Sequence, residues 1–120
     1  MRAEPPFSHS TFLQGTFPFV GRGLEQPFLL SDDLRYEVPA EKHAQMLYFR
    51  GGNSSDDLIY VVLMQNERPK RYFPIGAKGA SHVTLAIAAD IESGERCEVF
   101  VAAPKGTSGW IVVDVGFVEF

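Results

Sequence analysis

Short β-prone segments recur along the whole chain, and their spacing constrains the fold more than any other feature of the sequence. Each segment is rich in Val, Ile, Phe, Tyr or Leu, and Gly, Pro, Asn, Asp or Ser bound it. The segments are 16–20, 27–30, 34–38, 45–50, 58–64, 70–75, 82–88, 97–102 and 110–120. Eight or nine short strands with a turn signal after each predict an all-β, antiparallel sandwich or barrel.

Helix signals are few. Residues 39–46, "PAEKHAQM", contain enough helix formers for one turn, with Pro39 at its first position. Residues 85–95 also contain helix formers, but "IESGE" at their end reads equally well as a turn between two strands. Residues 1–10 contain two adjacent prolines and are expected to form an extended arm that pairs at a sheet edge or stays loose. We therefore expect one β-sandwich domain over 1–120 with little helix.

Composition excludes several classes of partner. A chain of 120 residues with 45% hydrophobic and 22% charged residues has the size and apolar content of one globular domain. Its formal charge of −4 disfavours a nucleic-acid binder, which needs Lys and Arg to neutralise phosphates, and it disfavours an anionic membrane surface equally. The remaining classes are binding modules, interaction proteins and enzymes.

The sequence shows no signal for secretion and no membrane span, and these features bear on the cellular compartment. The first ten residues have no apolar region of the kind a secretory signal needs, and no stretch approaches the ~20 apolar residues of a membrane span. The single cysteine, Cys97, cannot form an internal disulfide, and it lies in a strand-like run where a small half-buried hydrophobe is expected. We expect a soluble, cytoplasmic protein.

The alternation of the last segment separates two faces. Ile111, Val113, Val115 and Phe117 share one face and are predicted to be core. The opposite face carries Trp110, Val112, Asp114, Gly116, Val118 and Phe120. A face that mixes an aromatic, a carboxylate and a glycine is typical of a concave binding surface and also of a partly covered sheet. Segment 58–64 is apolar on both faces, which predicts a central strand.

Residues 50–57, "RGGNSSDD", interrupt the apolar pattern with an arginine, two glycines and five oxygen-bearing side chains. Such a loop can donate two or three ligands to calcium, although its spacing does not match an EF-hand loop. The favoured interpretation is a hairpin turn between 45–50 and 58–64. No metal is predicted.

Residues 68–82 contain four basic residues, two aromatics and two glycines. Basic residues interleaved with aromatics can hold an anion or stack on a sugar. The glycines do not have phosphate-loop spacing, so nucleotide binding is disfavoured. The favoured interpretation is nevertheless a solvated edge strand whose charges prevent edge-to-edge pairing with other sheets.

Catalytic motifs are not evident in the sequence. His9, His43 and His82 form no metal-binding pair, and His82 is the best candidate for a polar ligand contact. No Gly-x-Ser-x-Gly elbow occurs, and the adjacent carboxylates of Asp32-Asp33 and Asp56-Asp57 point to opposite faces on a strand. We predict no enzyme activity and no cofactor.

Two long stretches carry a resemblance. "LYFRGGNSSDDLIYVVL" and "SGERCEVFVAAPKGTSGWIVVDVGFVEF" resemble the strand-loop-strand and the closing strands of galactose-binding-like jelly-roll β-sandwiches, to which many carbohydrate-binding modules belong. In those modules the last strand often carries an Asp followed by aromatics and a Glu, and here Asp114, Phe117, Glu119 and Phe120 stand in that arrangement. The resemblance implies a jelly-roll fold and sugar binding, with Tyr48, Tyr72 and Trp110 as candidates for stacking.

We therefore predict a non-catalytic module for a small polar ligand, carbohydrate-like or anionic. Its site is placed where the 50–57 loop, the 68–82 loop and the last strand can converge. The candidate residues are Arg50, Asn53, Asp56, Asp57, Arg71, Tyr72, His82 and Asp114. The arginines would hold hydroxyls or an anion, the carboxylates would accept sugar hydroxyls or a cation, and Tyr72 would stack.

The alternative is a small structural or accessory subunit that binds a protein partner or forms a homodimer. Ten of the 120 residues are phenylalanine. Five of these phenylalanines lie early in the chain, at Phe7, Phe12, Phe17, Phe19 and Phe28. Some of them are expected to dock onto a partner.

Overall fold

Nine strands make up the fold in the computed structural model, which describes residues 8–120 without the side chains of residues 87–89. The strands are β1 His9–Val20, β2 Phe28–Leu29, β3 Arg35–Glu37, β4 Ala44–Asn53, β5 Ile59–Gln65, β6 Arg68–Ile75, β7 Ala80–Ile91, β8 Arg96–Ala102 and β9 Ser108–Glu119. No helix occurs among the described residues. The described residues accordingly contain no helix that is long and apolar enough to cross a membrane.

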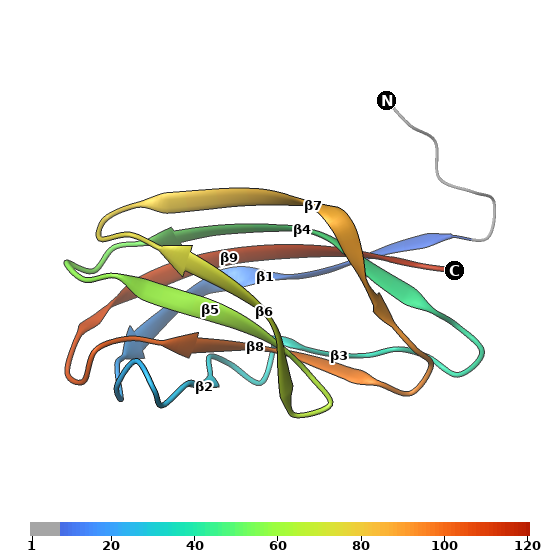
Figure 1. Ribbon diagram of the computed structural model, residues 1–120, viewed down its shortest axis with the longest axis horizontal. Helices are drawn as coiled ribbons and strands as arrows, with labels where there is room; N and C mark the ends of the chain where they lie inside the picture. Colours follow the sequence, from blue (N-terminus) through green and yellow to red (C-terminus); the bar gives the residue numbers. More distant parts are fainter. Residues whose placement is uncertain (1–7) are drawn as a thin grey trace.

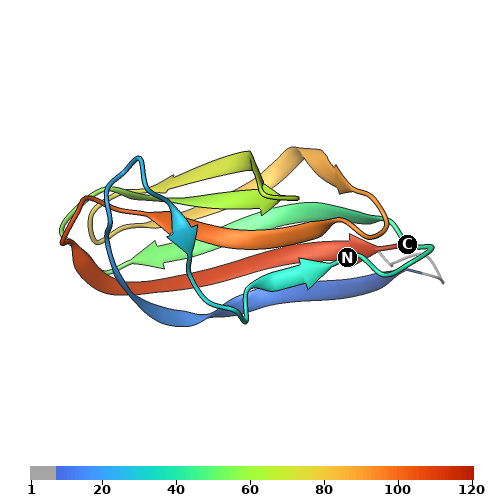
Figure 2. The ribbon, with the colours of Figure 1, turned by 90° about the horizontal axis from the view of Figure 1, so that it is seen from below.

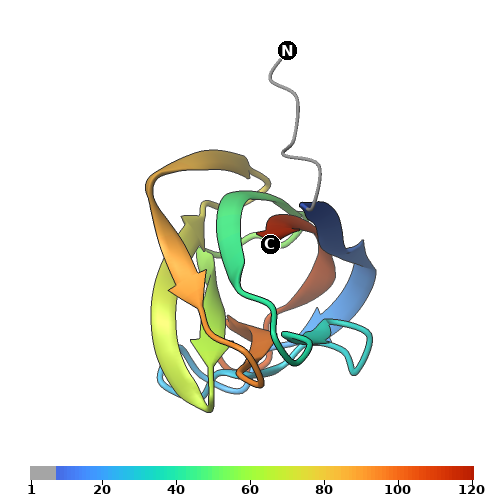
Figure 3. The same ribbon diagram turned by 90° about the vertical axis from the view of Figure 1, so that its right-hand side faces the viewer.

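The strands form two antiparallel sheets packed face to face (Figures 1 and 2). The first, called sheet A, has the order β1-β9-β4-β7, and the second, sheet B, has the order β2-β8-β5-β6 with β3 also paired to β8. Viewed along the strands, β7 arches over one side of the sandwich, and β6 lies in the opposite layer below it (Figure 3). The predicted all-β sandwich is confirmed.

Each of the nine β-prone segments of the sequence corresponds to one strand. The strands of sheet A extend further than the local pattern indicated, since β1 begins at His9 and β7 continues to Ile91. Residues 39–43 form a turn and not the single helical turn that their helix formers allow, and β4 begins at Ala44. Residues 92–95 form the predicted turn between β7 and β8, where Gly94 has a φ of 79°. The part of the N-terminal arm within residues 1–7 lies outside the described residues.

The core lies between the two sheets and follows the predicted alternation of β9. Its alternate residues Ile111, Val113, Val115 and Phe117 are buried. Phe49 of β4 stacks on Phe73 of β6 with ring centroids 4.4 Å apart, which joins the two sheets. Strand β5 is buried on both faces, as expected of a central strand. Apolar burial of this kind stabilises by about 25 cal/mol per Å².

The predicted hairpin at 50–57 is wrong. Strand β4 continues through both glycines to Asn53 in sheet A, whereas β5 belongs to sheet B, so the segment crosses from one sheet to the other. Gly51 is a packing glycine, because a Cβ there would lie 2.6 Å from the Phe49 ring and 2.9 Å from Ile75. Neither Gly51 nor Gly52 has the positive φ of a primed hairpin turn.

Candidate ligand-binding face

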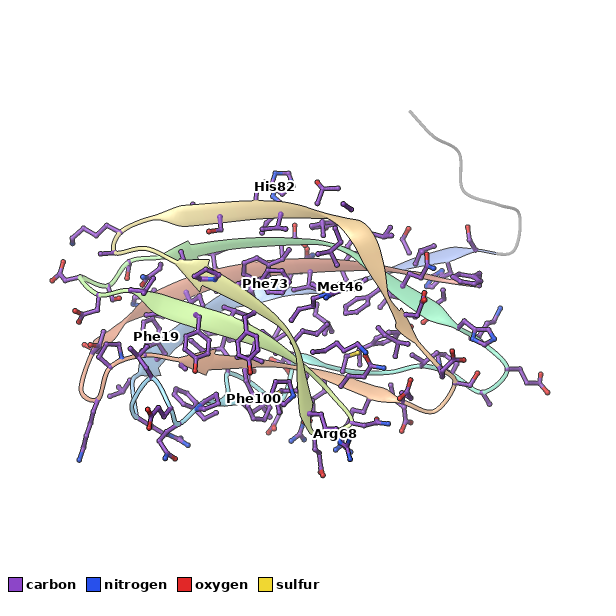
Figure 4. All side chains as sticks on the ribbon, in the orientation of Figure 1. Phe19, Met46, Arg68, Phe73, His82 and Phe100 are labelled. Atoms are coloured by element: carbon purple, nitrogen blue, oxygen red, sulfur yellow. The ribbon has the colours of Figure 1, made fainter. Side chains whose placement is uncertain are left out.

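Four polar side chains form a row across the outer face of sheet A. The strand register aligns Gln14 of β1, Asp114 of β9, Arg50 of β4 and His82 of β7. Antiparallel neighbours in register point to the same side of the sheet, and the outer position follows from the burial of the alternate residues on β9 and β4. We call these four residues the polar row. His82 points away from the core (Figure 4).

Asp114 is at the centre of the polar row. Its carboxylate accepts a hydrogen bond from the Tyr48 hydroxyl at 3.0 Å, and it lies 3.8 Å from the Arg50 guanidinium. Partial burial, followed by the hydrogen bond to Asp114, raises the pKa of Tyr48, so this hydroxyl stays protonated as a donor. The rings of Tyr48 and His82 meet edge to face at 6.4 Å. Asp114 thus connects Tyr48 and Arg50, and most of Arg50 remains open to solvent.

A depression of about 520 Å³ lies beside the polar row. It exists because Gly52 and Ala80, which are paired across β4 and β7, contribute almost no side-chain volume to this face. The remaining lining residues are Arg50, Gly51, Ser81, His82, Val112 and Asp114. The depression is therefore bordered on one side by three members of the polar row and on another by an apolar valine.

Aromatic side chains lie at both ends of the same face. Trp110 and Phe12 are 55% and 51% exposed, which is unusual for such large apolar groups. Phe12 pairs with Gly116, and Gly116 lies under the Tyr48 ring. A Cβ at Gly116 would lie 2.1 Å from that ring, so the glycine allows Tyr48 to lie flat on the sheet. Flat aromatic surfaces beside hydrogen-bonding groups suit ring-shaped polar ligands.

The structure brings together three of the eight predicted site residues: Arg50, His82 and Asp114. Asn53 is buried, and its side chain forms hydrogen bonds with backbone groups of this protein. Its Nδ2 donates to the carbonyl oxygens of Asp57 and Gly76 at 2.9 and 3.1 Å, and its Oδ1 accepts from the Ser55 backbone at 2.9 Å. These bonds fix the crossing between the sheets and leave Asn53 outside the depression.

Asp56 and Asp57 lie on the exposed crossing segment, away from the polar row. Asp56 pairs with Lys78 at 3.1 Å, and Asp57 accepts a hydrogen bond from the Thr107 hydroxyl at 2.6 Å. No group of three or more His, Cys, Asp or Glu side chains in residues 8–120 has the arrangement of a metal site.

Arg71 and Tyr72 lie on β6, in the other sheet. They line a separate groove of about 390 Å³ between β6 and β7. The predicted convergence of the 68–82 segment with Asp114 therefore holds only for its last residue, His82. Strand β6 is at the edge of sheet B, as the favoured interpretation of this segment predicted.

Sequence reasoning missed Gln14, Gly52 and Ala80. Gln14 is remote in sequence, and only the pairing of the first and last strands places it beside Asp114. The glycine pair of Gly51 and Gly52 predicts a turn, so the pattern does not mark Gly52 as part of a binding face. The alternation of β9 nevertheless predicted the outer face itself, including Trp110 and Val112.

Of the five early phenylalanines, Phe7 lies outside the described residues and Phe19 is buried. Phe17 and Phe28 pack against the core, so Phe12 alone of the four described is largely exposed.

Cys97 is fully buried, and burial together with Glu95 and Glu98 raises the pKa of its thiol to about 12. The Cys97 thiol is therefore protonated at neutral pH and packs as an apolar group of the core.

Comparison with known proteins shows a similarity of fold. No protein-family model matches the chain, and no curated protein matches it. Among solved structures, the chain is similar to the CBM36-1 domain of a multidomain xylanase from the hindgut metagenome of Trinervitermes trinervoides. The match has a TM-score of 0.51 and 13% sequence identity, and it covers 92% of this chain and 96% of that chain. The predicted resemblance to carbohydrate-binding-module-like β-sandwiches is therefore confirmed for the fold.

Proposed function

We propose that the chain is a non-catalytic jelly-roll module that binds a carbohydrate on the outer face of sheet A. The observation that carries this proposal is the polar row beside a depression, with exposed aromatics at both ends of the same face. A sugar presents hydroxyl groups at its rim and apolar C–H groups on its faces. A binding face for it needs hydrogen-bonding groups and flat apolar surfaces together.

Each residue of the face has a role in this proposal. Asp114 accepts hydrogen bonds from sugar hydroxyls, and Arg50 donates to hydroxyl oxygens through its exposed guanidinium. His82 and Gln14 extend the row on either side. Gly52 and Ala80 leave room for the ring, while Trp110 and Phe12 provide stacking surfaces.

Isothermal titration against a panel of soluble polysaccharides, including xylan, glucans and mannans, tests the proposal. We expect at least one of them to bind, and Asp114→Ala to weaken that binding at least about tenfold, the equivalent of about 1.4 kcal/mol. Asp56→Ala is the matched control, because its carboxylate lies on the crossing segment and not in the row. Equal affinity of wild type and Asp114→Ala would show that the face is misplaced.

Filling the depression is a second, independent test. A Cβ at Gly52 would lie 4.0 Å from Val112, an ordinary contact, so Gly52→Val fits the fold while it occupies the space for the ligand. We expect this variant to lose binding and keep its stability. Gly76→Val is the matched control, since a Cβ there meets nothing within 4 Å and Gly76 does not line the depression. Unchanged binding in Gly52→Val would contradict the proposal.

A further inference from the structure

Strand β6 concentrates positive charge at an edge of the sandwich that the proposed carbohydrate face does not use. Its eight residues, "RPKRYFPI", include three basic residues and no acid, in a chain whose formal charge is −4. The polar row is on sheet A, whereas β6 is the outer strand of sheet B. An acidic protein with one basic strand has a local field that attracts anions to that strand.

Two of these basic residues have no acidic partner among residues 8–120. Ion pairs in the described part of the chain join Arg35, Arg50, Lys78 and Arg96 to carboxylates, and none involves Arg68 or Lys70. Arg68 lies near the end of the β5–β6 hairpin and points away from the body of the molecule (Figure 4).

The acids at this end of the molecule already have partners. Glu67 pairs with Arg96 at 3.1 Å. The Glu95 carboxylate accepts hydrogen bonds from the side-chain amides of Gln65 and Asn66 at 3.0 and 3.1 Å. The amides that hold Glu95 are neutral and leave its charge in place, but neither Glu95 nor Glu67 forms an ion pair with Arg68 or Lys70, so both cations are available to an anion from solution.

Two hollows follow β6 along its length. The first, of about 530 Å³, is lined by Gln65, Asn66, Arg68, Pro69, Lys70 and Glu95. The second is the groove of about 390 Å³ between β6 and β7, whose lining includes Tyr72 and Pro74 together with Val83 and Leu85. The strand thus offers basic and polar groups at one end and apolar walls at the other.

Tyr72 provides a flat surface at the apolar end. It is 59% exposed, and its ring lies 5.8 Å from that of Tyr60. The Tyr60 hydroxyl donates to the Leu24 carbonyl, which holds this second ring in place. A supported, exposed aromatic ring can stack on the apolar face of a sugar.

We propose that β6 is a second binding edge, specific for an acidic polysaccharide. Carboxylate or sulfate groups of the polysaccharide pair with Arg68 and Lys70, and one sugar ring stacks on Tyr72. Charge alone would also suit an acidic peptide, but the exposed ring between Tyr60 and the groove favours a sugar. This edge is separate from the polar row, so either site can exist without the other.

Titration of polygalacturonate into the protein at low ionic strength tests the proposal. We expect binding that weakens as salt is added, because exposed charges are screened over about 10 Å at 0.1 M. The double variant Arg68→Ala/Lys70→Ala should lose at least about tenfold in affinity, or about 1.4 kcal/mol. The control Lys42→Ala/Lys105→Ala removes the same charge elsewhere and should bind like wild type.

Tyr72→Ala separates sugar recognition from charge. The exposed ring can be removed without disturbing the core, and we expect weaker polygalacturonate binding with no change in binding of a neutral polysaccharide on sheet A. Equal affinity for polyglutamate and polygalacturonate, with no effect of Tyr72→Ala, would overturn the proposal in favour of an acidic peptide. No binding of polygalacturonate, or equal losses in the two double variants, would overturn it outright. None of these results bears on the Asp114 test.

Discussion

Asn53 joins three segments of the chain through one buried side chain. It is the last residue of β4, and its Nδ2 donates to the carbonyl of Asp57 before β5 and to the carbonyls of Ile75 and Gly76 at the end of β6. Its Oδ1 also accepts the backbone and hydroxyl donors of Ser55, at 2.9 and 2.8 Å. The residue type that suggested a ligand contact in the sequence is used here to replace backbone pairing where the chain changes sheets.

Replacing Asn53 should therefore affect stability and leave binding intact. We expect Asn53→Ala to lower the free energy of unfolding by about 2–4 kcal/mol, because it leaves several buried polar groups unpaired. Urea denaturation measures this loss. Asp56→Ala, in the same segment but in an exposed ion pair, should change stability by less than about 0.5 kcal/mol. A small loss in Asn53→Ala would show that water replaces these bonds.

The buried thiol of Cys97 makes stability depend on alkaline pH. Its pKa is raised from 9.0 to about 12, chiefly by burial, so below pH 9 the thiol is protonated in both states and has no effect. Above pH 9 the unfolded chain loses the proton first, and stability falls as the pH rises towards 12. The thiol should account for a loss of about 1.4 kcal/mol by about pH 10.

Unfolding curves of wild type and Cys97→Ala between neutral pH and about pH 10 measure the share of the thiol. The variant should start less stable because of its small cavity, and its stability should fall less steeply with pH. Tyr36, whose pKa is raised by burial and by its hydrogen bond to Glu119, adds a loss in the same direction at higher pH in both proteins. Parallel curves would contradict the assignment to Cys97.

Single residues were predictable where the strand alternation decides their position. Asp114, Trp110 and the buried Ile111 follow from the period of two on β9. Asn53 was not predictable in this way, because its partners come from segments up to 23 residues away in sequence. A polar residue after two glycines has the same local pattern whether it binds a ligand or supports the backbone.

At the scale of elements, β4 and β9 are coupled by the contact between Tyr48 and Gly116. A side chain at 116 must displace the Tyr48 ring, which would separate its hydroxyl from Asp114. We expect Gly116→Ala to destabilise the protein by about 1–2 kcal/mol and to weaken carbohydrate binding.

A double-mutant cycle checks the cause. In a Tyr48→Ala background, Gly116→Ala should cost less than about 0.5 kcal/mol, because the ring that it displaces is already absent. Urea denaturation of the four proteins gives the coupling energy. An equal cost in both backgrounds would mean that the backbone at 116, and not the ring, requires glycine.

The existence of the strands was predictable, but their partners were not. Hydrophobic period and turn residues located all nine strands, because these signals are local. Whether β4 and β5 pair or lie in opposite sheets depends on which distant strands compete for their edges. The polar row follows from that pairing, so the sequence predicted Arg50, His82 and Asp114 as candidates but not Gln14 as their neighbour.

At the scale of the whole molecule, a ligand on sheet A should stabilise all nine strands together. A ligand at 100 times its Kd adds about 2.7 kcal/mol to the free energy of unfolding of a two-state domain, which raises Tm by about 10 °C for a chain of this size. Thermal unfolding with and without the bound polysaccharide measures the shift. It should be absent in Gly52→Val and full in Gly76→Val. A shift retained in Gly52→Val would place the ligand elsewhere.

The first and last strands pair along their whole length, from His9 with Glu119 to Val20 with Ser108, and β9 lies between β1 and β4 (Figure 1). A nascent chain emerging from the ribosome therefore cannot complete sheet A until β9 has left the exit tunnel. Until then β1 and β4 expose long unpaired edges, which is the state in which β-proteins aggregate. Synthesis of this chain has a vulnerable interval that lasts as long as β9 is still inside the exit tunnel.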